Sequence, residues 1–275
     1  MKMGTTGGKS ISVGNRNLNP PQWVDFDWED PKHGHQAKGE VTVIRPEGTS
    51  GELAAGLWRT GHGIVGCEAD GSCTIRYSAP LGDETMVLLE GSALITETAT
   101  GKQHRVAAGT ILSHPKGVDL LWQIDRPFLK KFWVMWNSAP KGATEHGLYV
   151  ANINDNASRW QPFVWSSDSA GGPTAGEFHV VRGQGSTGTY RCGLWRSGVG
   201  IAGCLADGSA SFSHCSPHGD ETLVLLEGQA HLLNEETGEE YVLQAGDIVG
   251  LPEGLPVKWT SKGPFLKKFS VFTRG

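Results

Sequence analysis

The chain has 275 residues, of which 19% are charged, and a formal net charge of −5. Lysine and arginine are dispersed along it without a basic stripe, which argues against a nucleic-acid partner. The longest apolar runs are the length of a strand, so we expect no membrane span. The start of the chain lacks the apolar centre of a secretory signal, and five cysteines are an odd number for a disulfide framework. We therefore expect a cytoplasmic protein.

One sequence segment occurs twice, over residues 82–91 and 219–228, at an interval of 137 positions. The same interval aligns residues 23–137 with 160–274, which agree at roughly four positions in ten. A long match at one fixed interval indicates a duplicated structural unit. The expected parts are a flexible leader over 1–22, an N-terminal domain over 23–137, a linker over 138–159 and a C-terminal domain over 160–275.

Each copy opens with large aromatic residues that we interpret as packing anchors. Short segments in which apolar and polar residues alternate then predict strands, and Asp-Gly dipeptides and single glycines predict the turns between them. The opening aromatics are Trp23, Phe26 and Trp28 in the first copy, and Trp160, Phe163 and Trp165 in the second; the predicted strands include 41–45, 73–77, 178–182 and 210–214. No other segment has apolar residues at helical spacing. Short strands with frequent turn signals predict an all-β fold.

The repeated segment predicts a strand that is apolar on both faces. Glu84, Met86 and Leu88 alternate with Thr85 and Val87, so only the leading glutamate interrupts the apolar pattern. A strand of this kind is covered on one side by its own barrel and on the other by a second domain or subunit. We therefore expect a homo-oligomer, in the form of a dimer.

Two spaced motifs resemble the signature motifs of the cupin family. The first copy has Glu84 and Gly91, followed by Gly109, Pro115 and Gly117, at the spacing of those motifs. The second copy repeats them at Glu221, Gly228, Gly246, Pro252 and Gly254. The Gly-Leu-Trp that opens a strand and the closing Lys-Lys-Phe are similar to the EutQ-like cupins, a branch linked by similarity to (S)-ureidoglycine aminohydrolase. The resemblance implies two tandem barrels with the RmlC-like jelly-roll fold, the double-stranded β-helix.

The resemblance also implies where a metal would bind. Metal-binding cupins present two histidines before the motif glutamate and a third after the second motif. In the first copy these positions hold Tyr77, Ala79 and Leu120, so Glu84 is alone and we expect no metal in the N-terminal barrel. Tyr77, Glu84 and Lys131 are left as the residues of a possible pocket there.

The second copy retains more of the expected ligands. His214 is at the first histidine position, His218 lies three residues before Glu221, and the remaining positions are Ser216 and Val257. His214, His218 and Glu221 therefore form a candidate metal site for Mn, Fe, Ni or Zn in the C-terminal barrel. The alternative interpretation is that His214 is a hydrogen-bonded pocket residue and His218 a solvated loop residue.

A lysine recurs at Lys131 and Lys268, where it can pair with the motif glutamate. Such a pair could serve acid–base chemistry at Glu221 and Lys268 without a metal, or form a structural salt bridge.

The first functional hypothesis is a metal-dependent enzyme that acts on a small polar metabolite. Its active site lies in the C-terminal barrel, with Glu221 and Lys268 as catalytic residues, and its chemistry is of the hydrolase type, similar to an aminohydrolase, or of the dioxygenase type. The alternative is a metal-free bicupin that binds a small-molecule ligand or has a structural role.

Overall fold

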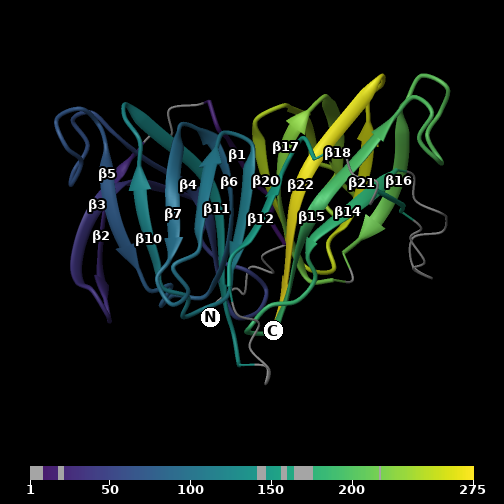
Figure 1. Ribbon diagram of the computed structural model, residues 1–275. Helices are drawn as coiled ribbons and strands as arrows, with labels where there is room; N and C mark the ends of the chain where they lie inside the picture. The colour runs from purple at the N-terminus through teal and green to yellow at the C-terminus, as the bar shows by residue number, and fades with distance from the viewer. Residues whose placement is uncertain (1–8, 18–21, 141–146, 156–159, 164–175, 217) are drawn as a thin grey trace, which may run out of the picture. The chain divides into compact units, whose positions relative to one another are not determined.

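The structure, a computed structural model, describes residues 9–17, 22–140, 147–155, 160–163, 176–216 and 218–275. These residues form strands and turns and contain no helix (Figure 1), as the sequence predicted. Within this part of the chain there is accordingly no helix that could cross a bilayer. Trp165 lies outside the described residues. The chain divides into two compact bodies, and each is described by itself.

The N-terminal body comprises the described residues within 16–156, 180–192 and 273–275. Its strands are β2 (Val24–Asp30), β3 (Gly34–Arg45), β4 (Glu52–Gly61), β5 (Cys73–Tyr77), β6 (Asp83–Glu90), β7 (Ser92–Glu97), β8 (Gln103–Ala107), β9 (Thr110–His114), β10 (Leu120–Ile124), β11 (Phe128–Asn137) and β12 (Tyr149–Asn152). One sheet has the strand order β12-β9-β6-β11-β4-β3-β2 and the other β5-β10-β7-β8.

The C-terminal body comprises the described residues within 1–15, 157–179 and 193–272. The remaining strands are β1 (Ser12–Asn15), β13 (Gln161–Pro162), β14 (Glu177–Arg182), β15 (Thr189–Gly198), β16 (Ala210–Cys215), β17 (Asp220–Glu227), β18 (Gln229–Asn234), β19 (Glu240–Gln244), β20 (Asp247–Leu251), β21 (Pro256–Ser261) and β22 (Phe265–Arg274). The sheet orders are β1-β20-β17-β22-β15-β14-β13 and β16-β21-β18-β19, which repeat the arrangement of the N-terminal body.

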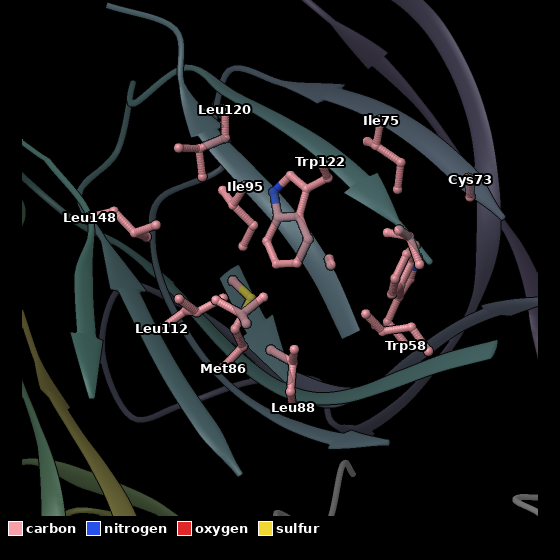
Figure 2. Close-up of a cluster of buried hydrophobic side chains, with 14 of the residues drawn as sticks. Trp58, Cys73, Ile75, Met86, Leu88, Ile95, Leu112, Leu120, Trp122 and Leu148 are labelled. Carbon is pink, nitrogen blue, oxygen red and sulfur yellow. The ribbon is translucent and has the colours of Figure 1, made fainter. Parts of the chain in front are cut away.

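The core of the N-terminal body lies between its two sheets. Figure 2 shows Met86 and Leu88 of β6 directed toward Ile95 of β7 and Trp122 of β10, and all four side chains are buried. Alternate residues of a strand point to opposite faces, so the repeated segment supplies this core with every second side chain.

The motif strand is buried on both faces, as its sequence predicted. On the face opposite Met86, Thr85 and Val87 are also buried, and Tyr190 of the same body donates its hydroxyl hydrogen to Thr85 Oγ1. Part of the apolar face from which we expected a dimer is therefore covered within the chain itself. The dimer stays a prediction, which light scattering would test.

Glycine after the motif strand is required by a close approach of two backbones. Gly91 has a φ of +81°, and a Cβ atom there would lie 2.1 Å from the carbonyl oxygen of Phe128. Gly228 repeats this geometry, with a φ of +83° and a distance of 2.3 Å to the oxygen of Phe265. Only glycine meets both conditions, which explains why the motif ends in this residue.

The structure differs from the expectation of a flexible leader over 1–22. Residues 12–15 form β1, which pairs antiparallel with β20, while its repeat equivalent β12 pairs with β9. β9 and β20 are themselves repeat equivalents. β1, which precedes the first repeat, therefore completes a sheet built mainly from the second repeat, and β12, which precedes the second repeat, completes a sheet built mainly from the first. The residues before β1 and β12 are also equivalent: Ile11 and Leu148 are both buried in a hydrophobic core cluster.

Ile11→Ala is expected to destabilise the C-terminal body by about 2 kcal/mol, because it removes a side chain that is only 9% exposed. Val13→Ala on the same segment is the control, since Val13 is 45% exposed and its loss should cost less than about 0.5 kcal/mol. Urea denaturation of the full chain measures both. Equal effects of the two variants would contradict the role assigned to this segment.

Candidate functional site

A cavity of about 210 Å³ lies between the two sheets of the N-terminal body. Its walls are aromatic and aliphatic, apart from a tyrosine, a glutamate and a lysine. The lining residues are Phe26, Trp28, Val41, Ala54, Trp58, Ile75, Tyr77, Leu81, Glu84, Trp122, Lys131, Trp133 and Met135. An apolar cavity with a few polar groups has the usual composition of a small-molecule site.

The polar part of the cavity is built on an ion pair between β6 and β11. Lys131 Nζ lies 2.9 Å from Glu84 Oε1 and 3.5 Å from Met86 Sδ. The ammonium group also lies 5.3 Å from the ring centroids of both Trp58 and Trp122, within cation–π distance. The lysine charge is therefore balanced by one carboxylate and flanked by two indole rings.

A histidine that we did not predict lies beside the carboxylate. His114 at the end of β9 is fully buried, and its Nδ1 lies 3.2 Å from the carbonyl oxygen of Pro115. Because a carbonyl oxygen can only accept, Nδ1 carries the hydrogen. Nε2 then faces Glu84 Oε2 at 3.6 Å. The second copy has Leu251 at this position, so a comparison of the two copies could have revealed the histidine.

These neighbours fix the charge of the polar groups at neutral pH. Burial by itself raises the pKa of Glu84, but the Lys131 ammonium and His114 outweigh burial and lower it to about 2. Burial and the adjacent Glu84 carboxylate raise the pKa of Tyr77 well above its ordinary value. Glu84 is thus a stable carboxylate and Tyr77 a stable phenol. The structure brings together the three residues predicted for this pocket.

The C-terminal body contains a related cluster. Lys268 Nζ lies 2.7 Å from Glu221 Oε1 and 4.8 Å and 5.8 Å from the ring centroids of Trp259 and Trp195. Ser270 donates its hydroxyl hydrogen to Glu221 Oε1 at 2.6 Å. Burial opposes ionisation of Glu221, but Lys268 and then His214 hold its pKa well below the usual range. The predicted pairing of Lys268 with Glu221 is therefore present.

The three residues predicted to hold a metal are not grouped as one site. His214 Nε2 lies 3.7 Å from Glu221 Oε2, whereas the ring of His218 packs edge-on against Phe272 at 5.9 Å. Among the described residues no three His, Cys, Asp or Glu side chains converge as metal ligands.

The electrostatics of this cluster also disfavour a second cation. The Glu221 carboxylate that would bind a metal already contacts the Lys268 ammonium group at 2.7 Å, and two positive charges at one carboxylate repel each other. The residues present therefore do not fit the metal site that the resemblance implied.

Comparison with known proteins finds a family-model match for one part of the chain. Residues 205–269 match the family model of the EutQ-like cupin domain. None of the curated proteins matches the sequence. The finer resemblance to (S)-ureidoglycine aminohydrolase stays a prediction.

Solved structures resemble the whole chain. A protein of unknown function of the DUF861 family from Pseudomonas syringae pv. tomato strain DC3000 is 19% identical, with a TM-score of 0.66 over 97% of this chain and 100% of that chain. Protein Ylba from E. coli, also of the DUF861 family, is 10% identical, with a TM-score of 0.62 over 97% and 91%. A variant of oxalate decarboxylase from Bacillus subtilis is 13% identical, with a TM-score of 0.53 over 98% and 78%. These similarities confirm the predicted all-β cupin jelly-roll fold.

Proposed function

We propose that the N-terminal barrel binds a neutral, single-ring organic molecule that carries one carbonyl or hydroxyl group, and that it does so without a metal. The observation that carries this proposal is the aromatic cavity whose polar lining residues are Tyr77, Glu84 and Lys131. This is the metal-free alternative of the two functional hypotheses drawn from the sequence.

The size of the cavity sets the size of the ligand. An apolar cavity of about 150 Å³ in another protein accommodates benzene. At about 210 Å³, the present cavity has room for one ring with one or two small substituents. Trp28, Trp58 and Trp133 supply flat apolar surfaces for such a ring, and aromatic rings prefer stacked or edge-on contacts with one another.

The polar end determines the charge of the ligand. An ammonium group has three hydrogens to donate, and the hydrogen bonds seen for Lys131 go to Glu84 and Met86. Among the residues that the structure describes, this leaves a third hydrogen for a carbonyl or hydroxyl oxygen of the ligand. Because Glu84 and Lys131 neutralise each other, a carboxylate ligand would add an uncompensated negative charge beside Glu84.

The ionisation of the polar groups favours binding over catalysis. General acid–base catalysis works best with groups whose pKa values lie near the working pH. The pKa of Glu84 is about 2 and that of Tyr77 is raised well above its ordinary value, so neither is close to neutral. A metal-dependent reaction in the C-terminal barrel stays a prediction, and we do not propose it because its three ligands do not converge among the described residues.

Binding of acetophenone, followed by quenching of tryptophan fluorescence, tests the proposal. Acetophenone is expected to bind at least about tenfold more tightly than benzoate, which has a similar shape but carries a charge. Ala54→Phe places a phenyl ring in the cavity wall and is expected to weaken binding at least about tenfold.

Val242→Phe is the matched control, because it adds the same group at a position in the other body that is 72% exposed. Tighter binding of benzoate, or unchanged binding in Ala54→Phe, would sink the proposal.

A further inference from the structure

The turn between β4 and β5 places two cysteines opposite each other. The backbone N–H of Glu68 donates to the carbonyl of Ser72 at 2.8 Å, which closes the turn, and Cys67 and Cys73 flank this pair on either side. Directly opposite residues of antiparallel chains have Cα atoms about 4.5–5.5 Å apart. Cysteines in this arrangement fall within the range of Cα separations, about 4.4–6.8 Å, that a disulfide spans.

The side chains of the two cysteines also turn toward the same piece of backbone, at Val65 and Gly66. Cys67 Sγ donates to the carbonyl oxygen of Val65 at 3.8 Å, and Cys73 Sγ donates to that of Gly66 at 3.5 Å. Burial and then the nearby Cys67 thiol raise the pKa of Cys73. Neither cysteine is joined in a disulfide in this structure. The backbone and the side chains therefore agree that the two sulfur atoms are neighbours.

We propose that Cys67 and Cys73 form a reversible dithiol–disulfide site that exchanges two electrons with small-molecule disulfides such as oxidised glutathione. The Cys67 thiolate attacks one sulfur of oxidised glutathione, whose S–S bond breaks and releases one glutathione thiolate. The Cys73 thiolate then attacks Cys67 Sγ in the mixed disulfide and releases the second glutathione. The two cysteines are oxidised, one glutathione disulfide is reduced, and two protons pass from the cysteines to the two glutathione thiolates.

The burial of the two residues gives the order of these steps. Cys67 is half-buried and can be reached from solvent, whereas Cys73 is 3% exposed and belongs to the core cluster of Figure 2. Burial raises the pKa of Cys73 to about 12, which makes it a poor first nucleophile. Its proximity to Cys67 suits it to the second, intramolecular step.

The C-terminal body provides an internal control. Its equivalent turn has the same backbone hydrogen bond, from Leu205 N–H to the carbonyl of Ser209 at 2.8 Å. Cys204 occupies the position of Cys67, but Ala210 occupies that of Cys73. The same turn therefore carries two thiols in one body and one thiol in the other.

Treatment of the full chain with oxidised glutathione, followed by alkylation and peptide mass spectrometry, tests the proposal. We expect the peptide that contains Cys67 and Cys73 to be about 2 Da lighter than its reduced, unalkylated form. Neither cysteine should then be alkylated. Dithiothreitol should restore both thiols. In Cys73→Ala, glutathione should instead remain attached to Cys67.

Ala210→Cys is the second variant, and it should gain an equivalent disulfide with Cys204. Continued alkylation of both Cys67 and Cys73 in the folded wild-type chain would overturn the proposal. So would a wild-type product that retains glutathione on Cys67 without closing the pair.

Discussion

Replacement of Asp83 by alanine is expected to lower the free energy of unfolding of the N-terminal body by about 3–5 kcal/mol. Asp83 and Arg182 are both buried, and Asp83 Oδ1 lies 3.0 Å from Arg182 Nη2. Asp83 also accepts hydrogen bonds from the backbone N–H groups of Ser186 at 2.9 Å and Thr187 at 3.1 Å. The substitution would leave a buried guanidinium without this counter-charge and two buried N–H groups without this acceptor.

Urea denaturation of the full chain, followed by tryptophan fluorescence, measures this effect. The control is Asp27→Ala, because Asp27 Oδ1 lies 2.7 Å from His35 Nε2 at a site where the side chains are 57% and 65% exposed. An exposed pair of this kind contributes less than about 1 kcal/mol. If Asp83→Ala were no more destabilising than the control, the structural role given to Asp83 would be wrong.

Glu84→Gln is expected to destabilise the N-terminal body by about 3 kcal/mol at neutral pH, because it leaves the Lys131 ammonium without its carboxylate. The pKa of Glu84 falls from 4.5 to about 2 on folding, which corresponds to about 3 kcal/mol of stability. Since the folded-state pKa is the lower one, this stability is present above about pH 4.5. It is lost as the pH falls toward the folded-state pKa of about 2.

Urea midpoints at about pH 7 and about pH 3 test this account. The difference between wild type and Glu84→Gln should be large at neutral pH and smaller in acid, because wild type then loses the carboxylate as well. Glu90→Gln is the control, since the Glu90 side chain is 55% exposed in its pair with Lys130. A difference that is independent of pH would argue against the ionised Glu84–Lys131 pair.

The sequence predicted the strands well where turn residues and alternation coincided. Residues 73–77 were expected as a strand and are β5, and the motif strand is buried on both faces. β1 and β12 were missed because they are only four residues long and pair with strands far along the chain. Extending the 137-residue comparison upstream would have aligned Val13 with Val150 and Asn15 with Asn152.

The candidate site was predictable in part, for a similar reason. The motif spacing identified Glu84 and the recurrent lysine, and the structure joins them at 2.9 Å. Spacing alone could not show that Trp58 and Trp122 flank Lys131, because these residues come from separate strands. His218 lies close to Glu221 in sequence, yet its ring contacts Phe272, which is distant in sequence. Proximity along the chain was therefore a poor guide to ligand geometry.

Isothermal titration of chelator-treated, full-length protein with acetophenone tests the central claim most directly. Elemental analysis of the same sample establishes its metal content. The account predicts saturable binding with about one site per chain in protein that contains no transition metal, and the same affinity after Zn or Mn is added. Binding that appears only after a metal is restored would contradict it, and so would no binding by the metal-free protein.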